Sequence, residues 1–340
     1  MLDHFQDKTV LITGGTGSFG STFARLLLKE SKVSKVIIFS RDEWKQWQMR
    51  EQDPLFHDPR VRFFLGDIRD EDRLRRAFHD VQIVIHAAAL KQVPAAEYNP
   101  TEFVKTNVLG AMNITSAAID CGVEKVIALS TDKAVNPLNL YGATKLCSDK
   151  LFIAANALVG KRGYPRFSIV RYGNVLGSRG SLLPFWKELL KEGKKSLPIT
   201  DLRMTRFWIS LEGSCRFVGH ISKVMQGAEI FVPKSVSVYI KDLAEALHPG
   251  IKLDVVGIRP GEKLNEVLIS HDEARTTVES RIFYCIQPQF EVHGSEQFKK
   301  ATQWKPVAAD FVLASDTNPL FTTSIEEIRA LVQGSSTCTL

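Results

Sequence analysis

The chain has 340 residues, 44% of them hydrophobic and 24% charged, which is the composition of an ordinary globular protein with room for a large core and a smaller lobe. The formal net charge of +6 suits an anionic small molecule, and without a long Lys/Arg block it predicts no nucleic-acid partner. The five cysteines are scattered and lack CxxC spacing, which excludes a disulfide framework, and the eight histidines lack HxH or HxxxH spacing, so we predict no metal site. The chain has no signal-like start and no long apolar span, so we predict that it is not a membrane protein and that it is cytoplasmic.

The first half of the chain alternates apolar, β-rich runs with helical patterns. Continuous apolar strands separated by helices indicate a parallel sheet covered on both faces. We therefore predict an α/β fold, a doubly wound parallel Rossmann sheet. The predicted strands are 9–13, 35–39, 61–66, 81–89, 125–130 and 167–175.

The pattern loosens after residue 176, where helical stretches at 182–193, 211–226 and 239–249 surround one strand at 252–258. From 290 the chain is irregular until a late helix at 324–333. We predict a cofactor-binding domain over 1–176 and a mixed C-terminal substrate-binding lobe over 177–335, with segments that can return to the first domain.

A glycine-rich loop, TGGTGSFG, joins the first strand to the first helix. Glycine permits a tight turn and lets backbone N–H groups and the helix N-terminus approach a pyrophosphate. The strand–loop–helix context makes this a dinucleotide-binding loop. Its predicted cofactor contacts are Gly14, Gly15, Thr16, Gly17, Ser18, Phe19 and Gly20.

The end of the second strand distinguishes NAD from NADP. NAD sites place a carboxylate there, about 20 residues after the glycines. Here the strand ends in Ser40 and Arg41, with Lys45 one helical turn later, and these groups suit a 2′-phosphate. We predict NADP; the alternative is that Arg41 and Lys45 are surface charges at a helix start, and the adjacent Asp42 weakens the case.

The next two strand ends supply further cofactor contacts. Asp67 and Ile68 follow the third strand, where the carboxylate can reach the adenine amine or instead cap the next helix. Ala87 and Ala88 follow the fourth strand, where small side chains let the cofactor lie close. Thr106, in the next helix, is predicted to join this group.

The fifth strand ends in Thr131, and Tyr141 and Lys145 follow at helical spacing. An ammonium close to a tyrosine lowers the pKa of the phenol, so the phenolate can accept a proton from a sugar hydroxyl while hydride leaves for the cofactor. Thr131 can hydrogen-bond the same hydroxyl. These three residues form the predicted redox part of a catalytic site.

These motifs resemble those of the extended short-chain dehydrogenase/reductase superfamily. Seven segments in order across the chain are similar to the inverting UDP-N-acetylglucosamine 4,6-dehydratases, which begin pseudaminic acid synthesis in bacteria that glycosylate flagellins. The segments are FSRDE-x-K, HAAALKQVP, STDKAVNPLNLYGATK, RYGNVLGSRGS, MTRFWIS and GIRPGEKLNE together with the glycine loop.

The resemblance implies a redox-neutral dehydration. Oxidation of carbon 4 acidifies the hydrogen on carbon 5; a base removes it and an acid protonates the departing carbon 6 hydroxyl. By resemblance, Lys133 is that base and Asp132 that acid, whereas retaining relatives carry a glutamate at the position of Lys133. Protonation of the opposite face of carbon 5, with Tyr141 as a candidate donor, would invert the sugar.

The Asp132–Lys133 pair carries a physical tension, because a free lysine has a pKa near 10.4. An ionised Asp132 would raise the Lys133 pKa further, whereas a shared-proton pair would let Lys133 act as a neutral base. The alternative is a loop salt bridge without chemistry.

The same resemblance implies the substrate contacts. Lys91 follows the fourth strand, Asn174 can donate to the diphosphate, and Val175 contacts the nicotinamide end of the cofactor. Arg259 and Glu262 resemble uridine and ribose contacts, and Arg206 is a further phosphate candidate. Each has the alternative of a surface role, and Trp186 and Trp208 are predicted to be core residues.

Rival functions remain open on the sequence alone. A UDP-sugar 4-epimerase or a retaining 4,6-dehydratase would use the same fold, and a non-catalytic NADP-sensing scaffold would not need the Thr131, Tyr141 and Lys145 set. Relatives form dimers or hexamers, so a homo-oligomer is expected.

Overall fold

The computed structural model describes residues 2–289 and 304–333, so part of the irregular stretch predicted from residue 290 lies outside the described residues. Its main feature is a ten-stranded sheet with the strand order β16-β14-β15-β10-β6-β5-β4-β1-β2-β3. The strands are β1 (Thr9–Thr13), β2 (Lys35–Ser40), β3 (Val61–Leu65), β4 (Ile83–His86), β5 (Lys125–Thr131), β6 (Arg166–Tyr172), β10 (Ile230–Pro233), β14 (Thr277–Glu279), β15 (Phe283–Ile286) and β16 (Lys305–Pro306).

The six predicted strands pair in parallel, as expected, and β10 extends the parallel part beyond β6. The remaining edge strands β15, β14 and β16 are antiparallel. The doubly wound prediction is therefore confirmed, and segments after residue 176 do join the sheet. The strand order reverses between β1 and β4, which is where sheets of this kind bind ligands.

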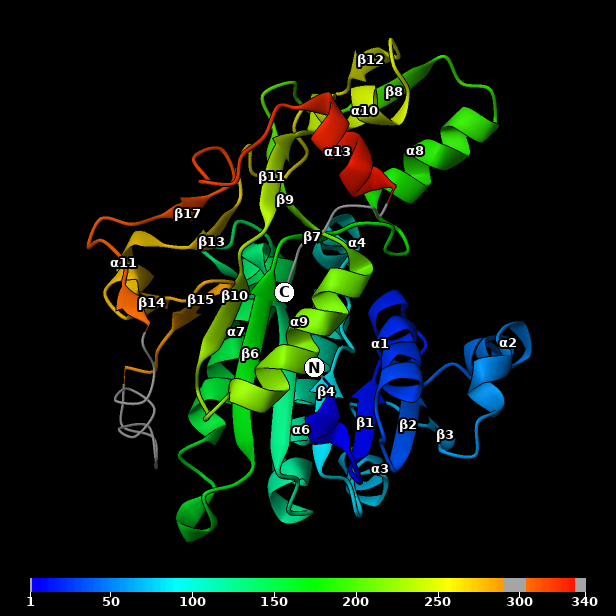
Figure 1. The fold of residues 1–340 in the computed structure, drawn as a ribbon, viewed down its shortest axis with the longest axis vertical. Helices are drawn as coiled ribbons and strands as arrows, with labels where there is room; N and C mark the ends of the chain where they lie inside the picture. Colours follow the sequence, from blue (N-terminus) through cyan, green and yellow to red (C-terminus); the bar gives the residue numbers. More distant parts are fainter. Residues whose placement is uncertain (1, 290–303, 334–340) are drawn as a thin grey trace.

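Both faces of the sheet are buried because alternate side chains point to opposite sides. In β1, Val10 and Ile12 belong to one core cluster while Leu11 belongs to the other. Helices α1 and α9 cover the first face, and α3, α6 and α7 cover the second (Figure 1).

The connection between β4 and β5 contains α4, α5, a π-helical segment η3 and α6, and such π segments often occur at functional sites. The elements are η1 (Asp3–Phe5), α1 (Ser18–Glu30), α2 (Glu43–Gln52), η2 (Pro54–His57), α3 (Glu71–Ala77), α4 (Val93–Tyr98), α5 (Pro100–Phe103), η3 (Val104–Leu109), α6 (Gly110–Asp120), η4 (Asp132–Ala134), α7 (Leu140–Ala155), η5 (Gly160–Arg162) and α9 (Leu211–Val224).

A second lobe packs around Trp186 and Trp208, which are 0% and 2% exposed, so the prediction that both are core residues is confirmed. The chain enters this lobe directly from the carboxyl end of β6, which sets the lobe beside the strand ends (Figure 1). Its elements are β7 (Asn174–Val175), α8 (Leu182–Lys191), β8 (Ser196–Ile199), β9 (Thr205–Ile209), β11 (Val236–Tyr239), α10 (Ile240–Leu247), β12 (Lys252–Val255) and α13 (Ile325–Val332). The remaining elements are β13 (Val267–Ile269), α11 (His271–Ala274) and β17 (Leu313–Ala314), and β13 and β17 contribute buried residues to a core cluster of the main sheet.

Over residues 2–289 and 304–333, no helix is long and apolar enough to cross a membrane.

Candidate active site

A cavity of about 690 Å³ opens where the strand order reverses, between the glycine loop and the loop after β6. The structure brings most of the predicted site residues to its wall. They are Gly14, Thr16, Gly17, Ser18, Phe19, Gly20, Ser40, Arg41, Lys45, Asp67, Ile68, Ala87, Ala88, Lys91, Thr106, Thr131, Asp132, Lys133, Tyr141, Lys145, Asn174 and Val175. Gly15, Arg206, Arg259 and Glu262 are not part of this wall.

The glycine loop is shaped by close backbone approaches. Gly14 has a φ of +66°, and a Cβ there would lie 2.9 Å from the backbone nitrogen of Ala88. A Cβ on Gly20 would lie 2.6 Å from the Cα of Gly15. Helix α1 has Gly17 as its N-cap, without a side-chain cap, so its amino end faces an uncovered cradle. This cradle fits the pyrophosphate of a dinucleotide, whereas Gly15 packs against β2.

At the end of β2, each predicted phosphate-binding cation already has a carboxylate neighbour. Arg41 lies 3.7 Å from Asp67, and Lys45 lies 2.7 Å from Asp42. The hydroxyl of Ser40 accepts a hydrogen bond of 3.1 Å from a glutamine of α2. The side chain of Arg41 is 55% exposed, so it is free to turn toward a ligand.

Asp67 does not cap the following helix, because Asp70 does so by accepting from the backbone N–H of Arg73. The helix-cap alternative for Asp67 is therefore wrong. Burial would raise the pKa of Asp67, but the hydrogen bonds that its carboxylate accepts from Arg69 outweigh burial and hold the pKa below its usual value. An ionised acceptor therefore faces the cavity at the end of β3.

The side of the cavity near β4 contains an unpaired hydroxyl. Thr106, in the π-helical segment η3, is 6% exposed, and its Oγ1 has no hydrogen-bond partner among the described residues. The next residue, Asn107, is fully engaged, because it donates to the carbonyl of Leu90 and to the hydroxyl of Thr144. The π-helical turn thus fixes Asn107 while leaving Thr106 available to a ligand.

The catalytic candidates after β5 are linked by short hydrogen bonds. Asp132 is fully buried, and its Oδ1 accepts from the hydroxyl of Thr131 at 2.9 Å and from Nζ of Lys133 at 3.1 Å. Its other oxygen, Oδ2, is buried without a hydrogen-bond partner among the described residues. A carboxylate oxygen that is desolvated beside a cavity is well placed to exchange a proton with a ligand.

A carboxylate that we did not predict completes this cluster. Glu266, 2% exposed, lies immediately before β13 with its Oε1 3.1 Å from Nζ of Lys133. Burial would lower the pKa of Lys133, but the charges of Asp132 and Glu266 outweigh burial and raise it well above its usual range. Glu266 ends the segment GIRPGEKLNE, so its place in that motif was the only signal in the sequence.

Tyr141 and Lys145 lie on α7, which begins after Asn139, whose side chain caps the helix. Burial raises the pKa of Tyr141 to about 12, while the Lys133 ammonium and hydrogen bonding from Thr131 lower it. Lys145 donates to the carbonyl of Leu129 at 2.8 Å, and burial lowers its pKa. Among the charges of the protein itself, Lys133 is therefore the main cation acting on the phenol, a role expected of Lys145.

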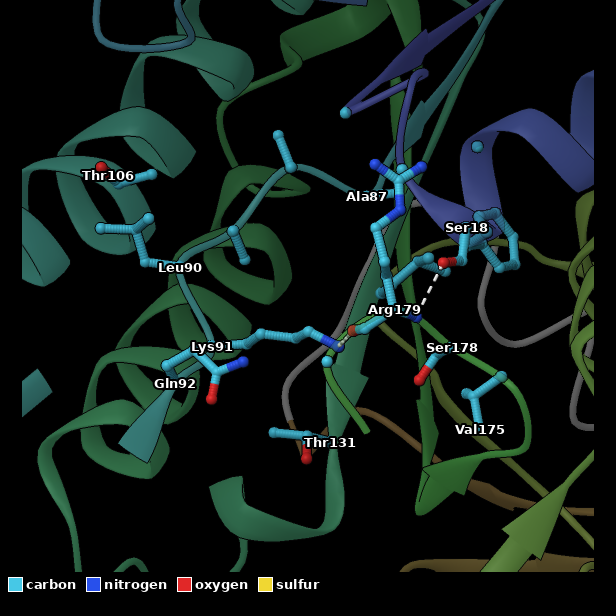
Figure 2. Close-up of a pocket in the computed structure, with 18 of the residues that line it drawn as sticks. Ser18, Ala87, Leu90, Lys91, Gln92, Thr106, Thr131, Val175, Ser178 and Arg179 are labelled. Atoms are coloured by element: carbon cyan, nitrogen blue, oxygen red, sulfur yellow. Dashed lines mark hydrogen bonds between the residues drawn. The ribbon is translucent and has the colours of Figure 1, made fainter. Parts of the chain in front are cut away.

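Arg179 also reaches the cavity without having been predicted. Its backbone N–H donates to the hydroxyl of Ser18 at 3.0 Å, and its guanidinium donates to the carbonyl of Thr16 at 3.1 Å. Lys91 donates to the carbonyl of Arg179 at 3.2 Å, and burial lowers the Lys91 pKa. Figure 2 shows Arg179 extended from the loop after β7 toward the glycine loop, with Lys91 approaching from the opposite wall.

Three predicted substrate residues lie outside the cavity wall. Arg206 is 6% exposed and donates to the carbonyls of Thr205, Leu264 and Lys263, so its guanidinium holds the backbone rather than a phosphate. Arg259 and Glu262 form an exposed turn in which the Arg259 N–H donates to the Glu262 carboxylate at 3.2 Å.

That turn nevertheless lies close to the catalytic helix, because Asn139 donates to the carbonyl of Gly261 at 2.8 Å. No group of three or more His, Cys, Asp or Glu side chains in the part of the chain that the structure describes is placed to hold a metal ion.

The arrangement can support acid–base chemistry next to a dinucleotide. A phenol, an amine and a buried carboxylate face one cavity together with an anion-binding glycine loop. One phenol would suffice to remove a proton during a simple alcohol oxidation. The additional lysine–carboxylate pair allows a second proton transfer in the same cavity.

Comparison with known proteins is consistent with this chemistry. Residues 10–288 match the model of the family described as polysaccharide biosynthesis protein. A Campylobacter jejuni protein named UDP-N-acetylglucosamine 4,6-dehydratase (inverting) is 52% identical over 95% of this chain and 96% of its own length. A Rickettsia massiliae protein named UDP-glucose 4-epimerase is 43% identical over 83% of each chain.

A solved structure of a Streptomyces venezuelae dTDP-glucose 4,6-dehydratase double mutant, with NAD bound, covers 75% of this chain and 86% of its own. It has a TM-score of 0.67 and 26% sequence identity.

Proposed function

The chain belongs to the polysaccharide biosynthesis protein family, and from that premise and the cavity we propose that it is an inverting UDP-N-acetylglucosamine 4,6-dehydratase. The enzyme removes water across carbons 5 and 6 of the sugar and inverts carbon 5. It is a carbon–oxygen lyase acting on a nucleotide sugar. The observation that carries this function is the Thr131–Asp132–Lys133 cluster beside Tyr141 in one cavity.

The cofactor is a nicotinamide dinucleotide held by the glycine loop, Asp67 and Thr106. When bound, it accepts a hydride from carbon 4, later returns it to carbon 6, and adds positive charge to the cavity. We assign Tyr141 to accept the proton of the carbon 4 hydroxyl, with Thr131 orienting that hydroxyl. Because burial raises the Tyr141 pKa to about 12, the Lys133 ammonium and the charge of the bound cofactor must both favour the phenolate.

The ketone at carbon 4 makes the carbon 5 hydrogen acidic, because the resulting carbanion is an enolate. Lys133 removes this proton, and Asp132 protonates the oxygen that leaves carbon 6 as water. The hydrogen bond from Lys133 to Asp132 provides the starting state for both steps. Transfer of one proton from the Lys133 ammonium to the Asp132 carboxylate produces both the neutral amine and the protonated acid that the reaction needs. A proton then returns to carbon 5 on the opposite face, and we assign Tyr141 as its donor.

The cofactor form is proposed to be NADP, although the comparison structure contains NAD. Arg41 is the residue placed to meet a 2′-phosphate, since its side chain is largely exposed and its contact with Asp67 is long, at 3.7 Å. Lys45 is less available because Asp42 lies 2.7 Å away.

The substrate is proposed to be a UDP-sugar that enters between the loop after β4 and the second lobe. Lys91 and Asn174 line the cavity and are assigned to the diphosphate. Arg259 and Glu262 are assigned to the uridine and ribose, since their turn is attached to the start of α7 through Asn139.

The rival functions differ in their need for the Lys133 cluster. A 4-epimerase requires the Tyr141 proton transfer but no base at carbon 5 and no acid at carbon 6. By resemblance, a retaining dehydratase carries a glutamate at the position of Lys133, and a scaffold protein needs no acid–base groups. The paired, buried geometry of Asp132 and Lys133 therefore favours the inverting dehydratase.

One incubation tests this function. The purified protein is mixed with UDP-N-acetylglucosamine, loss of water is followed by mass spectrometry, and carbon 5 is assigned by NMR. We expect a 4-keto-6-deoxy product with inverted carbon 5. A product that retains the carbon 6 hydroxyl would identify an epimerase, and an unchanged carbon 5 would identify a retaining enzyme. No turnover would favour the scaffold.

Three expectations stay predictions: the cytoplasmic location, a homo-oligomer that is a dimer or hexamer, and a product that leads to pseudaminic acid.

A further inference from the structure

Glu266 reaches Lys133 from a different part of the chain than Asp132 does. Asp132 precedes Lys133 in η4, whereas Glu266 lies immediately before β13, which packs against η4. The two carboxylates each approach Nζ of Lys133 to 3.1 Å. The amine is therefore held between two buried acceptors, and its side chain is only 24% exposed.

The charge of Glu266 is balanced on its other sides by two cations. Nε of Arg206 lies 4.0 Å from Oε1, and Nζ of Lys263 lies 3.9 Å from Oε2. Both cations are fixed by the backbone, since Arg206 donates to three carbonyls and Lys263 donates to the carbonyl of Val135 at 2.6 Å. These cations lie beyond hydrogen-bond distance, and Oε2 of Glu266 has no hydrogen-bond partner among the described residues, so the closest charged group to the carboxylate is Lys133.

Asp132 and Glu266 have different duties in the proposed reaction. Asp132 gives up a proton to the leaving oxygen, so its charge changes during turnover. Glu266 has no such duty, so the proposed reaction does not change its charge. The other charged or titratable groups near Lys133 are the cations Arg206 and Lys263, which oppose its positive charge, and the phenol of Tyr141 from α7.

We propose that Glu266 is a positioning residue that holds the Lys133 amine in the cavity and makes it a stronger base toward carbon 5. This inference rests on the proposed function, because it takes Lys133 as the base that removes the carbon 5 proton. The effect of Glu266 on Lys133 itself can be measured without turnover. A carboxylate this close stabilises the ammonium that forms as the amine accepts the carbon 5 proton.

The test is a direct titration of Lys133 in the full-length protein. Trace acetic anhydride acylates only neutral amines, and peptide mass spectrometry across a range of pH gives the titration midpoint of Lys133. In Glu266→Gln, which keeps the shape and removes the charge, we expect the midpoint to fall by about 1–3 pH units. An unchanged midpoint in a folded Glu266→Gln protein would overturn the proposal.

Three further variants make the result specific. Glu266→Asp keeps the negative charge but moves it farther from Lys133, so the Lys133 midpoint should fall by less than in Glu266→Gln. If Glu266→Gln does not fold, Glu266→Asp is the test variant, and an unchanged Lys133 midpoint in it would refute the proposal. Lys263→Gln removes a neighbouring cation and should move the midpoint upward. Glu229→Gln removes another buried carboxylate, which is 2% exposed and accepts a hydrogen bond from Ser168. It should leave the titration midpoint of Lys133 unchanged.

The catalytic readout is deuterium incorporation at carbon 5. In Glu266→Gln, the pH at which exchange reaches its limiting rate should fall with the Lys133 midpoint, and that limiting rate should fall about tenfold because the amine is a weaker base. A purely structural role would lower the rate without moving the pH profile. If Lys133 titrates as expected but no exchange occurs in the wild-type protein, the proposed function fails while the Glu266–Lys133 coupling stands.

Discussion

Lys133 and Glu266 meet across the boundary between the parallel sheet and the second lobe, with Nζ and Oε1 3.1 Å apart. The pair lies 133 positions apart in the chain, so only the fold brings the two charges together. It places Lys133 in a buried cluster with two carboxylates rather than in a simple pair with Asp132.

Replacing Lys133 with alanine should abolish solvent deuterium incorporation at carbon 5 while oxidation at carbon 4 stays measurable. Loss of a general base costs about 10²- to 10⁴-fold in rate. The control is Lys29→Ala, because Lys29 is an exposed residue of α1. Exchange at the wild-type rate in Lys133→Ala would show that another group is the base.

Tyr141→Phe should lower carbon 4 oxidation by about 10²- to 10⁴-fold, since the phenol no longer accepts the hydroxyl proton. Because burial raises the Tyr141 pKa to about 12, the wild-type rate should increase with pH on the alkaline side. That increase should disappear in the variant. Single-turnover absorbance of the reduced cofactor measures both effects, and an equally steep pH dependence in Tyr141→Phe would assign the titration to another group.

Arg179→Ala should weaken cofactor retention, because the Arg179 guanidinium donates to the carbonyl of Thr16, beside the proposed pyrophosphate cradle. We expect about a tenfold rise in the cofactor dissociation constant, measured by titration and by loss of cofactor on gel filtration. Arg179→Lys should recover part of the affinity. Arg203→Ala, which removes an exposed arginine paired with Asp201, should have no effect.

Arg41→Ala should reduce the affinity for NADP by about 10-fold or more while leaving NAD binding nearly unchanged, since only NADP carries the 2′-phosphate that Arg41 can meet. Isothermal titration with both cofactors measures the ratio. Equal losses of affinity for NADP and NAD would mean that Arg41 contacts a part of the cofactor that both dinucleotides share.

His86 should make stability depend on pH in the acid range. Its ring is buried, with Nδ1 hydrogen-bonded to the hydroxyl of Thr13 at 2.8 Å. Burial, together with the positive charge of Lys145, lowers the pKa of His86 to about 3. The unfolded chain binds a proton near pH 6.5, so the free energy of unfolding should decrease as the pH falls from about 6.5 toward 3.

The measurement is urea unfolding at pH 7.5 and 5. In His86→Gln the loss of stability between these pH values should be smaller, by about 1–2 kcal/mol. His79→Gln, at a residue whose side chain is 82% exposed, should keep the wild-type dependence. If His86→Gln loses as much stability as the wild type, His4, which burial also holds at a low pKa of about 4, is the stronger contributor.

The sequence alone determined the parallel sheet, the glycine loop and the Tyr141–Lys145 helix, because each follows from local patterns. Apolar runs with alternating helices specify the layers. A Cβ on Gly20 would meet Gly15 within the same strand–loop–helix unit, and Gly14 has a positive φ of +66°. The residues that it predicted for the cofactor lie, with the exception of Gly15, along one cavity wall.

Only the tertiary structure decided which charges share a site. Arg206 looked like a phosphate ligand in sequence, yet three carbonyls occupy its donors. Glu266 and Arg179 lie inside the quoted segments GIRPGEKLNE and RYGNVLGSRGS, but their roles depend on contacts with Lys133 and the glycine loop far away in the chain. The protonation of a buried lysine depends on every charge within a few ångströms, so the properties of Lys133 could not be read from its neighbour Asp132 alone.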